Sequence, residues 1–495
     1  MEQTDNKQVQ QQRERLLSND LAKNLKCFDD IFGASADYYA KTLEISRCKA
    51  AVILFDGIAG TATLWTVLLD ALNRGNLFDV DKNIDGQFIF EKILYHSDLA
   101  AEKQSVKTIA EFTQRITSGH AVLLLDGCAE GIAFSVQMLR FRSVSEPSGE
   151  GNLRGSREGF TDLMRINLGL LRRLNRSESL VLEVAQADTH LKTEYALCYD
   201  SAKVDAQLLA SVRERLTAAR PVLLLDSSYF MPWLSPKRFR LFSPVYYTER
   251  PAVAIAKINE GKVVVLVNGS PSALVAPALF AEHFECLDDY GGTAYFASFI
   301  RVLKYLSFYL TVLLPGVFVM VANDMPQLIP AALLYKIMAA EQATPLPLFA
   351  EMLLVIFLLE IIREAGLRMP QSLGHSVSLV AALIIGDAAI SAGVMSTPVI
   401  LVAAITSIAM FVTPTLYEPA TVLRILFVLA AGLAGAIGVV FLVFLLFLSL
   451  SELSLFGVPY FLSAGHGLLR DGVVRRNYRT LSRESFTIQR AKKED

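Results

Sequence analysis

Residues 425–451 read ILFVLAAGLAGAIGVVFLVFLLFLSLS and contain no charged side chain. A helix rises about 1.5 Å per residue, so a helical stretch of this length crosses a hydrocarbon core of roughly 30 Å with some tilt. Residues 292–465 together hold only fourteen Asp, Glu, Lys and Arg residues. Because a water-soluble surface needs a higher density of charge, this half of the chain is predicted to be a membrane domain.

The first half has an ordinary charge density, so the overall figures of 53% hydrophobic and 19% charged residues average two unlike parts. The net charge of −2 gives no indication of a nucleic-acid partner. Residues 1–15 are polar and lack the pattern of a secretory signal, so the first half is predicted to stay in the cytosol. Its five cysteines are widely spaced with no CxxC pair, which favours reduced structural thiols and predicts neither a metal site nor a cofactor.

One short apolar pattern recurs in the first half: AVILFDG at 51–57, AVLLLDG at 121–127, PVLLLDS at 221–227 and VVVLVNG at 263–269. Each predicts a buried strand that ends in a tight turn. Helix-period stretches at 61–72 and 205–218 lie between them, so an α/β layer architecture is expected. No GxGxxG or GxxxxGK[ST] motif follows any of these strands, so structural turns explain the pattern better than nucleotide binding.

Residues 144–156 (VSEPSGEGNLRGS) are rich in Ser, Gly and Glu and predict a linker between two soluble subdomains. Ser156 is then expected to cap a helix with an apolar stripe of Phe160, Met164, Leu168, Leu171 and Leu174, while Arg157, Arg165, Arg172 and Arg173 point elsewhere. Two interpretations remain open, a core helix with solvated arginines and a docking surface for a neighbouring subunit.

The second half begins with a predicted span at 305–323, preceded by basic residues that can reach cytosolic headgroups. Residues 324–345 are broken by prolines and predict an interfacial or re-entrant helix. Residues 346–364 are expected to return. This segment and its exit carry the charged residues Glu351, Glu360, Arg363, Glu364 and Arg368. Charges cost less near the membrane faces, and Glu364 and Arg368 stand four residues apart, so a structural role is favoured for them.

Small residues recur at every fourth position in 374–393, at Gly374, Ser378, Ala382 and Gly386, and Gly393 ends the segment. Such a stripe lets helices approach closely in lipid. The acid Asp387 beside it is costly there without a partner or a wet path. One interpretation is a ring of these helices around a pore, and the other is a hydrogen bond from Asp387 to a neighbouring helix. The pore-lining candidates are Ser376, Leu379, Ala382, Leu383, Gly386, Asp387 and Ile390.

Residues 388–417 predict another span and 425–451 a last one, with Gly432, Gly435 and Gly438 as a packing face. The tail 467–495 holds eight basic residues against four acids, which predicts a cytosolic location. Five crossings from the cytosol would leave the tail outside, so one segment must be re-entrant or cross again. We therefore expect four to five spans, with the topology open.

Several blocks resemble the A subunit of the GerA family of bacterial spore germinant receptors. The most specific are REAGLRMP at 363–370, IGDAA at 385–389 and FGVPY at 456–460. Further blocks are GFTDLMRINLGLLRR at 159–173, TERP at 248–251 and GKVVVLVNGSP at 261–271. Many members have Gln where this chain has Asp387, a difference that bears on the polarity of the pore. The resemblance implies a protein of the spore inner membrane that works with a transporter-like B subunit and a lipoprotein C subunit, and a ring that conducts ions once nutrient binds.

The expected fold is thus an α/β cytosolic region of two subdomains followed by an all-α transmembrane helix bundle. The expected parts are a polar N-terminal segment 1–44, subdomain 45–143, linker 144–156, subdomain 157–290, transmembrane domain 291–465 and basic cytosolic tail 466–495. The expected function is a nutrient-gated channel subunit and not an enzyme, since no catalytic constellation has an informative spacing. The alternatives are a non-conducting scaffold, which would pass no current, and a secondary transporter, which would show internal repeats.

Overall fold

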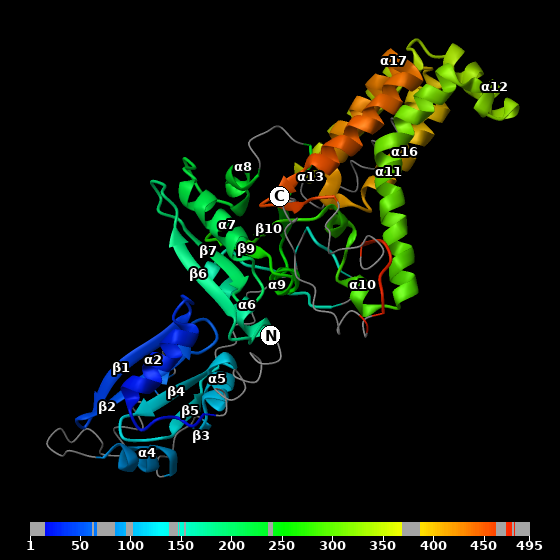
Figure 1. Cartoon of the computed structure of the whole chain (residues 1–495). Coiled ribbons are helices and arrows are strands. Elements are labelled where there is room, and N and C mark those ends of the chain that lie inside the picture. The colour runs from blue at the N-terminus through cyan, green and yellow to red at the C-terminus, as the bar shows by residue number, and fades with distance from the viewer. Residues whose placement is uncertain are drawn as a thin grey trace, which may run out of the picture. The chain divides into compact units, whose positions relative to one another are not determined.

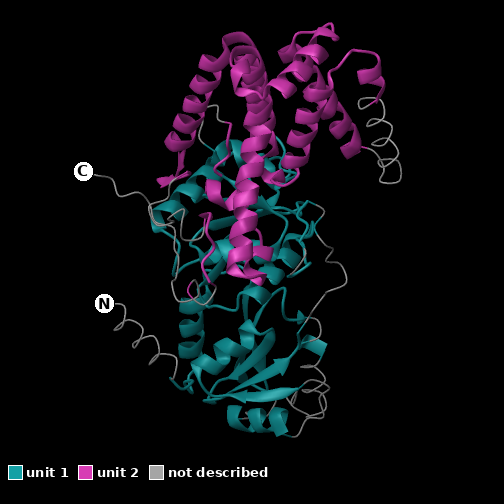
Figure 2. Cartoon of the chain, turned by 90° about the vertical axis from the view of Figure 1, so that its right-hand side faces the viewer, with its two compact units in different colours: residues 1–237, 245–277, 485–489 teal, residues 238–244, 278–484, 490–495 magenta. Residues whose placement is uncertain are grey.

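The computed structural model describes residues 15–61, 64–66, 85–95, 102–137, 147, 149–152, 155–235, 241–368, 387–461, 472–477 and 480. The chain forms two compact units (Figures 1 and 2). Unit 1 consists of residues 1–237, 245–277 and 485–489, and unit 2 of residues 238–244, 278–484 and 490–495. Unit 1 contains two β-sheets and unit 2 is helical.

The first sheet of unit 1 has five strands in the order β1-β2-β4-β5-β3, and every pairing is antiparallel. Its elements are α2 (Leu21–Phe32), β1 (Tyr38–Ile45), β2 (Cys48–Phe55), α4 (Gly86–Tyr95), β3 (Lys103–Val106), α5 (Ile109–Thr117), β4 (His120–Leu125) and β5 (Gly131–Ser135). Alternate residues of a strand point to opposite sides, and in this sheet both sides are apolar, so helices cover both faces. Ala50, Val52 and Leu54 of β2 pack with the α4 side, whereas Ile53 and Phe55 pack with α2 and α5.

The second sheet has the order β6-β7-β9-β10-β8, again antiparallel throughout. Its elements are α6 (Met164–Leu174), β6 (Leu180–Gln186), β7 (Glu194–Asp200), α7 (Ala206–Ala218), η2 (Ser227–Phe230), α8 (Met231–Leu234), β8 (Tyr246–Thr248), α9 (Pro251–Asn259), β9 (Val263–Val267) and β10 (Ala273–Ala276). Numbered along the chain, its strand order repeats that of the first sheet. The α/β layering is confirmed, and unit 1 consists of two sheets with the same topology.

Three sequence predictions for unit 1 were wrong. Residues 221–225 form no strand: Val222 is 87% exposed, and β9 already has β7 and β10 on its two sides. The N-terminal segment is not merely polar, since α2 and β1 within it complete the first sheet and its cover. The predicted helix starts at Met164 and not after Ser156, whose hydroxyl instead accepts a hydrogen bond from the backbone of Glu158. Residues 62–63 and 67–72 of the predicted helix, and residues 144–146, 148 and 153–154 of the predicted linker, lie outside the described residues.

Arg172 of α6 joins the two sheets of unit 1. Its side chain is fully buried, although it was predicted to be solvated. Nε donates to Asp37 Oδ2 at 2.8 Å, and Nη2 donates to Asp37 Oδ1 at 3.0 Å and to Ser35 Oγ at 2.8 Å. The guanidinium also lies 4.4 Å from the ring centroid of Phe55. Helix α6 packs on the second sheet. Asp37 and Ser35 directly precede β1, so Arg172 also binds α6 to the first sheet. Neither interpretation of this helix included that contact.

Unit 2 is a bundle around a core that includes Phe280, Phe308, Val399, Phe427 and Tyr460. Its elements are η3 (Phe280–Phe284), α10 (Asp288–Gly291), α11 (Ala294–Asp324), η4 (Pro326–Leu328), α12 (Ala331–Gln342), α13 (Leu348–Arg368), α15 (Ala389–Ser391), α16 (Thr397–Met410), η6 (Pro414–Leu416), α17 (Tyr417–Glu452), β11 (Ser454–Leu455) and β12 (Val458–Pro459). The predicted helices at 305–323, 324–345 and 346–364 correspond to α11, α12 and α13.

Helix α17 folds back on itself at Gly435, where φ is 56° and ψ is −140°. A Cβ atom at Gly438 would lie 2.6 Å from the carbonyl oxygen of Ala430. In a straight helix, residues 430 and 438 would be about 12 Å apart along the axis, so the two cannot belong to one straight helix. Both ends of α17 also lie near η3: Thr415 Oγ1 donates to the His283 carbonyl, and Phe280 donates to the Tyr460 carbonyl. The prediction of a single span over 425–451 was therefore wrong, and α17 is a hairpin of two limbs, 417–434 and 436–452.

The hairpin defines two ends of unit 2. We call the end with η3 the near end and the end with Gly435 the far end. At the far end, Asp324 at the last turn of α11 accepts a hydrogen bond from the backbone of Ala436 at 2.7 Å. Among the described residues, two helical segments, 294–324 and 414–452, are long and apolar enough to cross a membrane by length and composition, and 397–410 is a shorter apolar helix. These two segments do not establish the predicted four to five spans.

Candidate functional site

Glu351 lies in the first turn of α13 at the far end and is 0% exposed. Its Oε1 accepts a hydrogen bond from the backbone N–H of Ser396, the residue that precedes α16. Within the part of the chain that the structure describes, Glu351 Oε2 and the Ser396 hydroxyl are both buried without a hydrogen-bond partner. The sequence marked Glu351 as a charged residue near a membrane face, whereas the structure places its carboxylate inside the bundle.

Glu360 lies on the same helix towards the near end, and both of its oxygens have partners. Oε1 accepts from Arg424 of α17, and Oε2 accepts from the Tyr417 hydroxyl. Arg363 adds an ion pair to Oε2 at 3.8 Å, and its guanidinium stacks 3.0 Å from the Tyr417 ring centroid. Glu360 therefore ties α13 to the first limb of α17, as expected of a structural ion pair.

The pair predicted at the end of α13 is present. Arg368 Nη2 lies 2.6 Å from Glu364 Oε1, and both side chains are largely exposed. An exposed pair of this kind contributes less than about 1 kcal/mol, so it supports the helix end and little more.

The predicted pore-lining helix is described only at its last residues. Asp387 is exposed in the single chain, and Ile390 is half-buried. The other residues assigned to that helix, which are Gly374, Ser376, Ser378, Leu379, Ala382, Leu383 and Gly386, lie outside the described residues. The assignment of this helix to a pore stays a prediction.

The glycines predicted for helix packing have different roles. Gly432 packs against the Phe349 ring of α13, and Gly438 packs against the first limb of its own hairpin. Gly435 is not a packing position but the reversal itself, because its backbone conformation excludes other residues. Gly393 follows α15 with φ of 66°, where it ends the helix.

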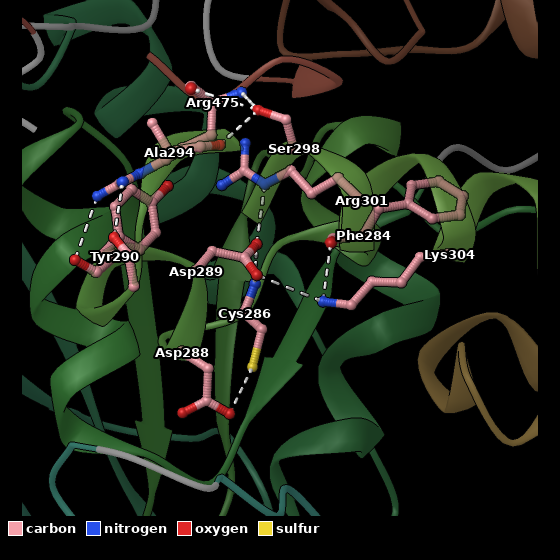
Figure 3. Close-up of polar contacts among 11 residues, drawn as sticks. Phe284, Cys286, Asp288, Asp289, Tyr290, Ala294, Ser298, Arg301, Lys304 and Arg475 are labelled. Atoms are coloured by element: carbon pink, nitrogen blue, oxygen red, sulfur yellow. Dashed lines mark hydrogen bonds and ion pairs between the residues drawn. The ribbon is translucent and has the colours of Figure 1, made fainter. Parts of the chain in front are cut away.

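A polar cluster that the sequence did not predict surrounds the start of α11 (Figure 3). Arg301 of α11 is fully buried and donates from Nε to Asp289 Oδ2 at 2.8 Å, while Lys304 Nζ lies 3.9 Å from Asp289 Oδ1. Arg301 and Arg475 lie on the Tyr290 ring, 5.6 and 5.7 Å from its centroid. Asp289 therefore accommodates two basic side chains from the first turns of α11.

Arg475 comes from the C-terminal tail and is 3% exposed. Its Nη1 and Nη2 donate to the carbonyls of Gly292 and Tyr290 at 3.2 Å each, and its backbone N–H donates to Ser298 Oγ at 3.0 Å (Figure 3). The tail is thereby held at the near end, where α11 begins. The sequence indicated only that the tail is basic. That composition does not distinguish the buried Arg475 from the neighbouring exposed Arg476.

Comparison with known proteins supports the resemblance read from the motifs. The family model described as Bacillus/Clostridium GerA spore germination protein matches residues 26–486. Spore germination protein KA of Bacillus subtilis (strain 168) is 33% identical over 458 residues, 91% of this chain and 83% of that protein. Spore germination protein B1 of the same organism is 30% identical over 467 residues, 93% of this chain and 95% of that protein.

A third relative, the uncharacterized membrane protein YfkQ of Bacillus subtilis (strain 168), is 28% identical and covers 99% of this chain and 96% of its own length. Among solved structures, the N-terminal domain of the A subunit of the Bacillus megaterium spore germinant receptor GerK3 matches 54% of this chain and 98% of its own, with 23% identity and a TM-score of 0.43. Because the family model spans nearly the whole sequence, the chain belongs to the GerA family of spore germination proteins.

Proposed function

We propose that this chain is the A subunit of a nutrient germinant receptor of the spore inner membrane, and that several copies form a ring that conducts ions when nutrient is bound. Its partners would be a transporter-like B subunit and a lipoprotein C subunit. Nutrient on the partner would favour the open ring by a shift of population. Family membership supports the receptor role, and the charged groups inside the helical unit support an ion pathway.

The observation that carries the membrane part of the proposal is the apolar exterior of the α17 hairpin. Leu433 is 79% exposed, Ile437 82%, Val440 66% and Phe441 59%. An apolar surface of this kind is costly in water and typical of helices that face lipid. The two limbs, at about 27 and about 25 Å, match the hydrocarbon thickness far better than an unbroken α17 of about 54 Å would.

The positions of the helix ends favour six crossings in place of four to five. Helices α11, α13 and α16 and the two limbs of α17 give five passages. The end of α13 at Arg368 follows the near-end residue Glu360, whereas Ser396 before α16 lies at the far end beside Glu351, which favours one further crossing between these two points. An even number of crossings returns the tail to the side on which α11 begins. The basic tail can then lie in the cytosol, which five crossings would not allow.

A test of the channel is the substitution Asp387→Asn in receptor complexes reconstituted into planar bilayers. If Asp387 lies in the ion path, removal of its charge should lower selectivity for cations over anions or change the leak current, because fixed charges at a pore favour counter-ions. The Glu364→Gln variant at an exposed ion pair is the matched control and should conduct normally. Unchanged conduction with normal germination would remove Asp387 from the mechanism, and no current from the wild-type complex would favour a scaffold.

A further inference from the structure

Two of the acids of helix α13, Glu351 and Glu360, lie about 14 Å apart along its axis, and their surroundings differ sharply. Glu360 has two guanidinium groups and a phenol on its two oxygens. Glu351 is fully buried and has one backbone N–H on one oxygen. Within the described residues, no Lys, Arg or His forms an ion pair with Glu351. Within the described part of the chain, basic side chains thus neutralise Glu360 but not Glu351.

The contact that Glu351 does make accounts for only part of its charge. Ser396 is the N-cap residue of α16, a 14-residue helix, and its N–H donates to Glu351 Oε1. A helix N-terminus carries the equivalent of roughly half a positive elementary charge. The helix end offsets only part of a negative charge on Glu351, and an uncompensated charge in apolar surroundings is costly.

Two buried oxygens are left for a ligand on the same pair of residues. Among the residues that the structure describes, Glu351 Oε2 has no hydrogen-bond partner, and neither has Ser396 Oγ, which makes no cap hydrogen bond to its own helix. The chain is non-helical between α15 and α16, over residues 392–396, next to the carboxylate. Non-helical backbone at membrane depth is tolerated where it is buried in protein or lines a water-filled cavity.

We propose that Glu351 Oε2 and Ser396 Oγ bind a monovalent alkali cation at the far end of the helical unit. A divalent ion is disfavoured because it needs several carboxylates, and the described residues contain no group of three or more acidic, His or Cys side chains that could hold a metal. The site rests on the proposed function, since it places a cation position within the membrane unit of the proposed channel.

The test is cation-linked stability of the purified full-length protein in detergent. The fraction that stays monodisperse after heating is measured by size exclusion in NaCl, KCl or choline chloride at equal ionic strength and fixed pH. A ligand that binds only the folded state raises the melting temperature with its concentration. We expect Na⁺ or K⁺ to stabilise the wild type relative to choline. The apparent cation affinity should fall at least tenfold in Glu351→Gln and measurably in Ser396→Ala.

The control is Glu360→Gln, which should lower the melting temperature but keep the cation dependence, because Glu360 is neutralised by Arg424 and Arg363. If Glu351→Gln does not fold, Ser396→Ala and Glu351→Asp decide the question. Equal stability of the wild type in all three salts would overturn the proposal, as would a cation effect that survives in Glu351→Gln. The measurement needs no conduction, so a silent bilayer with intact cation binding would reject only the channel.

Discussion

Arg172 and Arg165 both extend from α6 towards the first sheet, but burial gives them different energetic roles. Arg172 binds Asp37 with two hydrogen bonds at a site where both side chains are at most 4% exposed. Arg165 lies 3.8 Å from Asp56, with side-chain exposures of 87% and 50%. A buried pair that loses one partner leaves an uncompensated charge, whereas an exposed pair is screened by water.

We therefore predict that Arg172→Ala lowers the free energy of unfolding of unit 1 by about 3–5 kcal/mol, and that Arg165→Ala lowers it by less than about 1 kcal/mol. Both tryptophans of the chain, Trp65 and Trp233, belong to unit 1, so urea unfolding followed by tryptophan fluorescence reports on this unit in the full chain. Equal losses in the two variants would show that Arg172 does not hold the sheets together.

Glu150 lies where the chain leads from the first sheet to the second. Burial, supported by the nearby Glu249, raises the pKa of its carboxyl to about 7, although the hydrogen bond from Thr248 opposes this shift. Arg250 holds the same segment through the carbonyls of Glu150 and Ser156. The folded state thus keeps Glu150 protonated at pH values where the unfolded chain has already lost that proton.

The stability that Glu150 contributes should be complete below pH 4.5, the ordinary pKa, and should be lost as the pH rises to about 7. The loss is on the order of 3 kcal/mol. We predict that Glu150→Gln, which stays neutral, equals the wild type at pH 4.5 and exceeds it at pH 8 in the same fluorescence assay. Parallel pH profiles for the two proteins would contradict this prediction.

At the scale of elements, α17 decides how unit 2 is built. Its apolar run contains no proline or polar break that marks a turn, and Gly435 resembles the neighbouring Gly432 and Gly438 in sequence. The reversal depends on the contacts at the far end, where Asp324 of α11 caps the second limb through Ala436. This cap uses the carboxylate of one helix to satisfy a free N–H at the start of another.

We predict that Gly435→Ala destabilises unit 2 by about 1–3 kcal/mol or more, because a residue with Cβ strains this backbone conformation and its side chain would meet the Asp324 carboxylate. The control is Gly366→Ala in α13, where a Cβ meets no atom within 4 Å and helix propensity improves. Retention of monodisperse protein after heating distinguishes the two. A Gly435→Ala protein as stable as the Gly366→Ala protein would argue against the hairpin.

At the scale of the whole molecule, the contacts of Arg475 hold the tail beside the start of α11. The tail binds the residues just before and within the first turns of α11, which are also those that follow unit 1 in the chain. A tail on the opposite side of a membrane from unit 1 would not make these contacts. The proposed six crossings agree with these contacts and with the basic composition of the tail.

We predict that single cysteines at Arg476 and at Lys192 of unit 1, in a background without native cysteines, react with a membrane-impermeant maleimide from the same side. A cysteine at Lys336 of α12 should react from the opposite side. Labelling is measured in sealed vesicles of known orientation. Reaction of the Arg476 and Lys192 positions from opposite sides would exclude an even number of crossings.

Much of the fold was predictable because it depends on local pattern. Three of the four repeated apolar patterns are β2, β4 and β9, and α7 begins after Asp205 as its capping chemistry predicts. The failures have a common cause. Residues 221–225 have strand-like side chains but no free sheet edge at β9, and Arg172 has the spacing of a solvated residue but faces Asp37 from another sheet. In both cases the partner lies far away in sequence.

The sequence by itself determined the family, the division into a charged part and an apolar part, strands β2, β4 and β9 and most of the longer helices, because these follow from composition and from the periods of helix and strand. Only the tertiary structure decided that α17 turns back and that the tail returns to the start of α11. It also decided that, among the described residues, Glu360 has two basic partners and the buried Glu351 has none. These properties arise from contacts between distant residues, and their energies depend on burial, which no local pattern records.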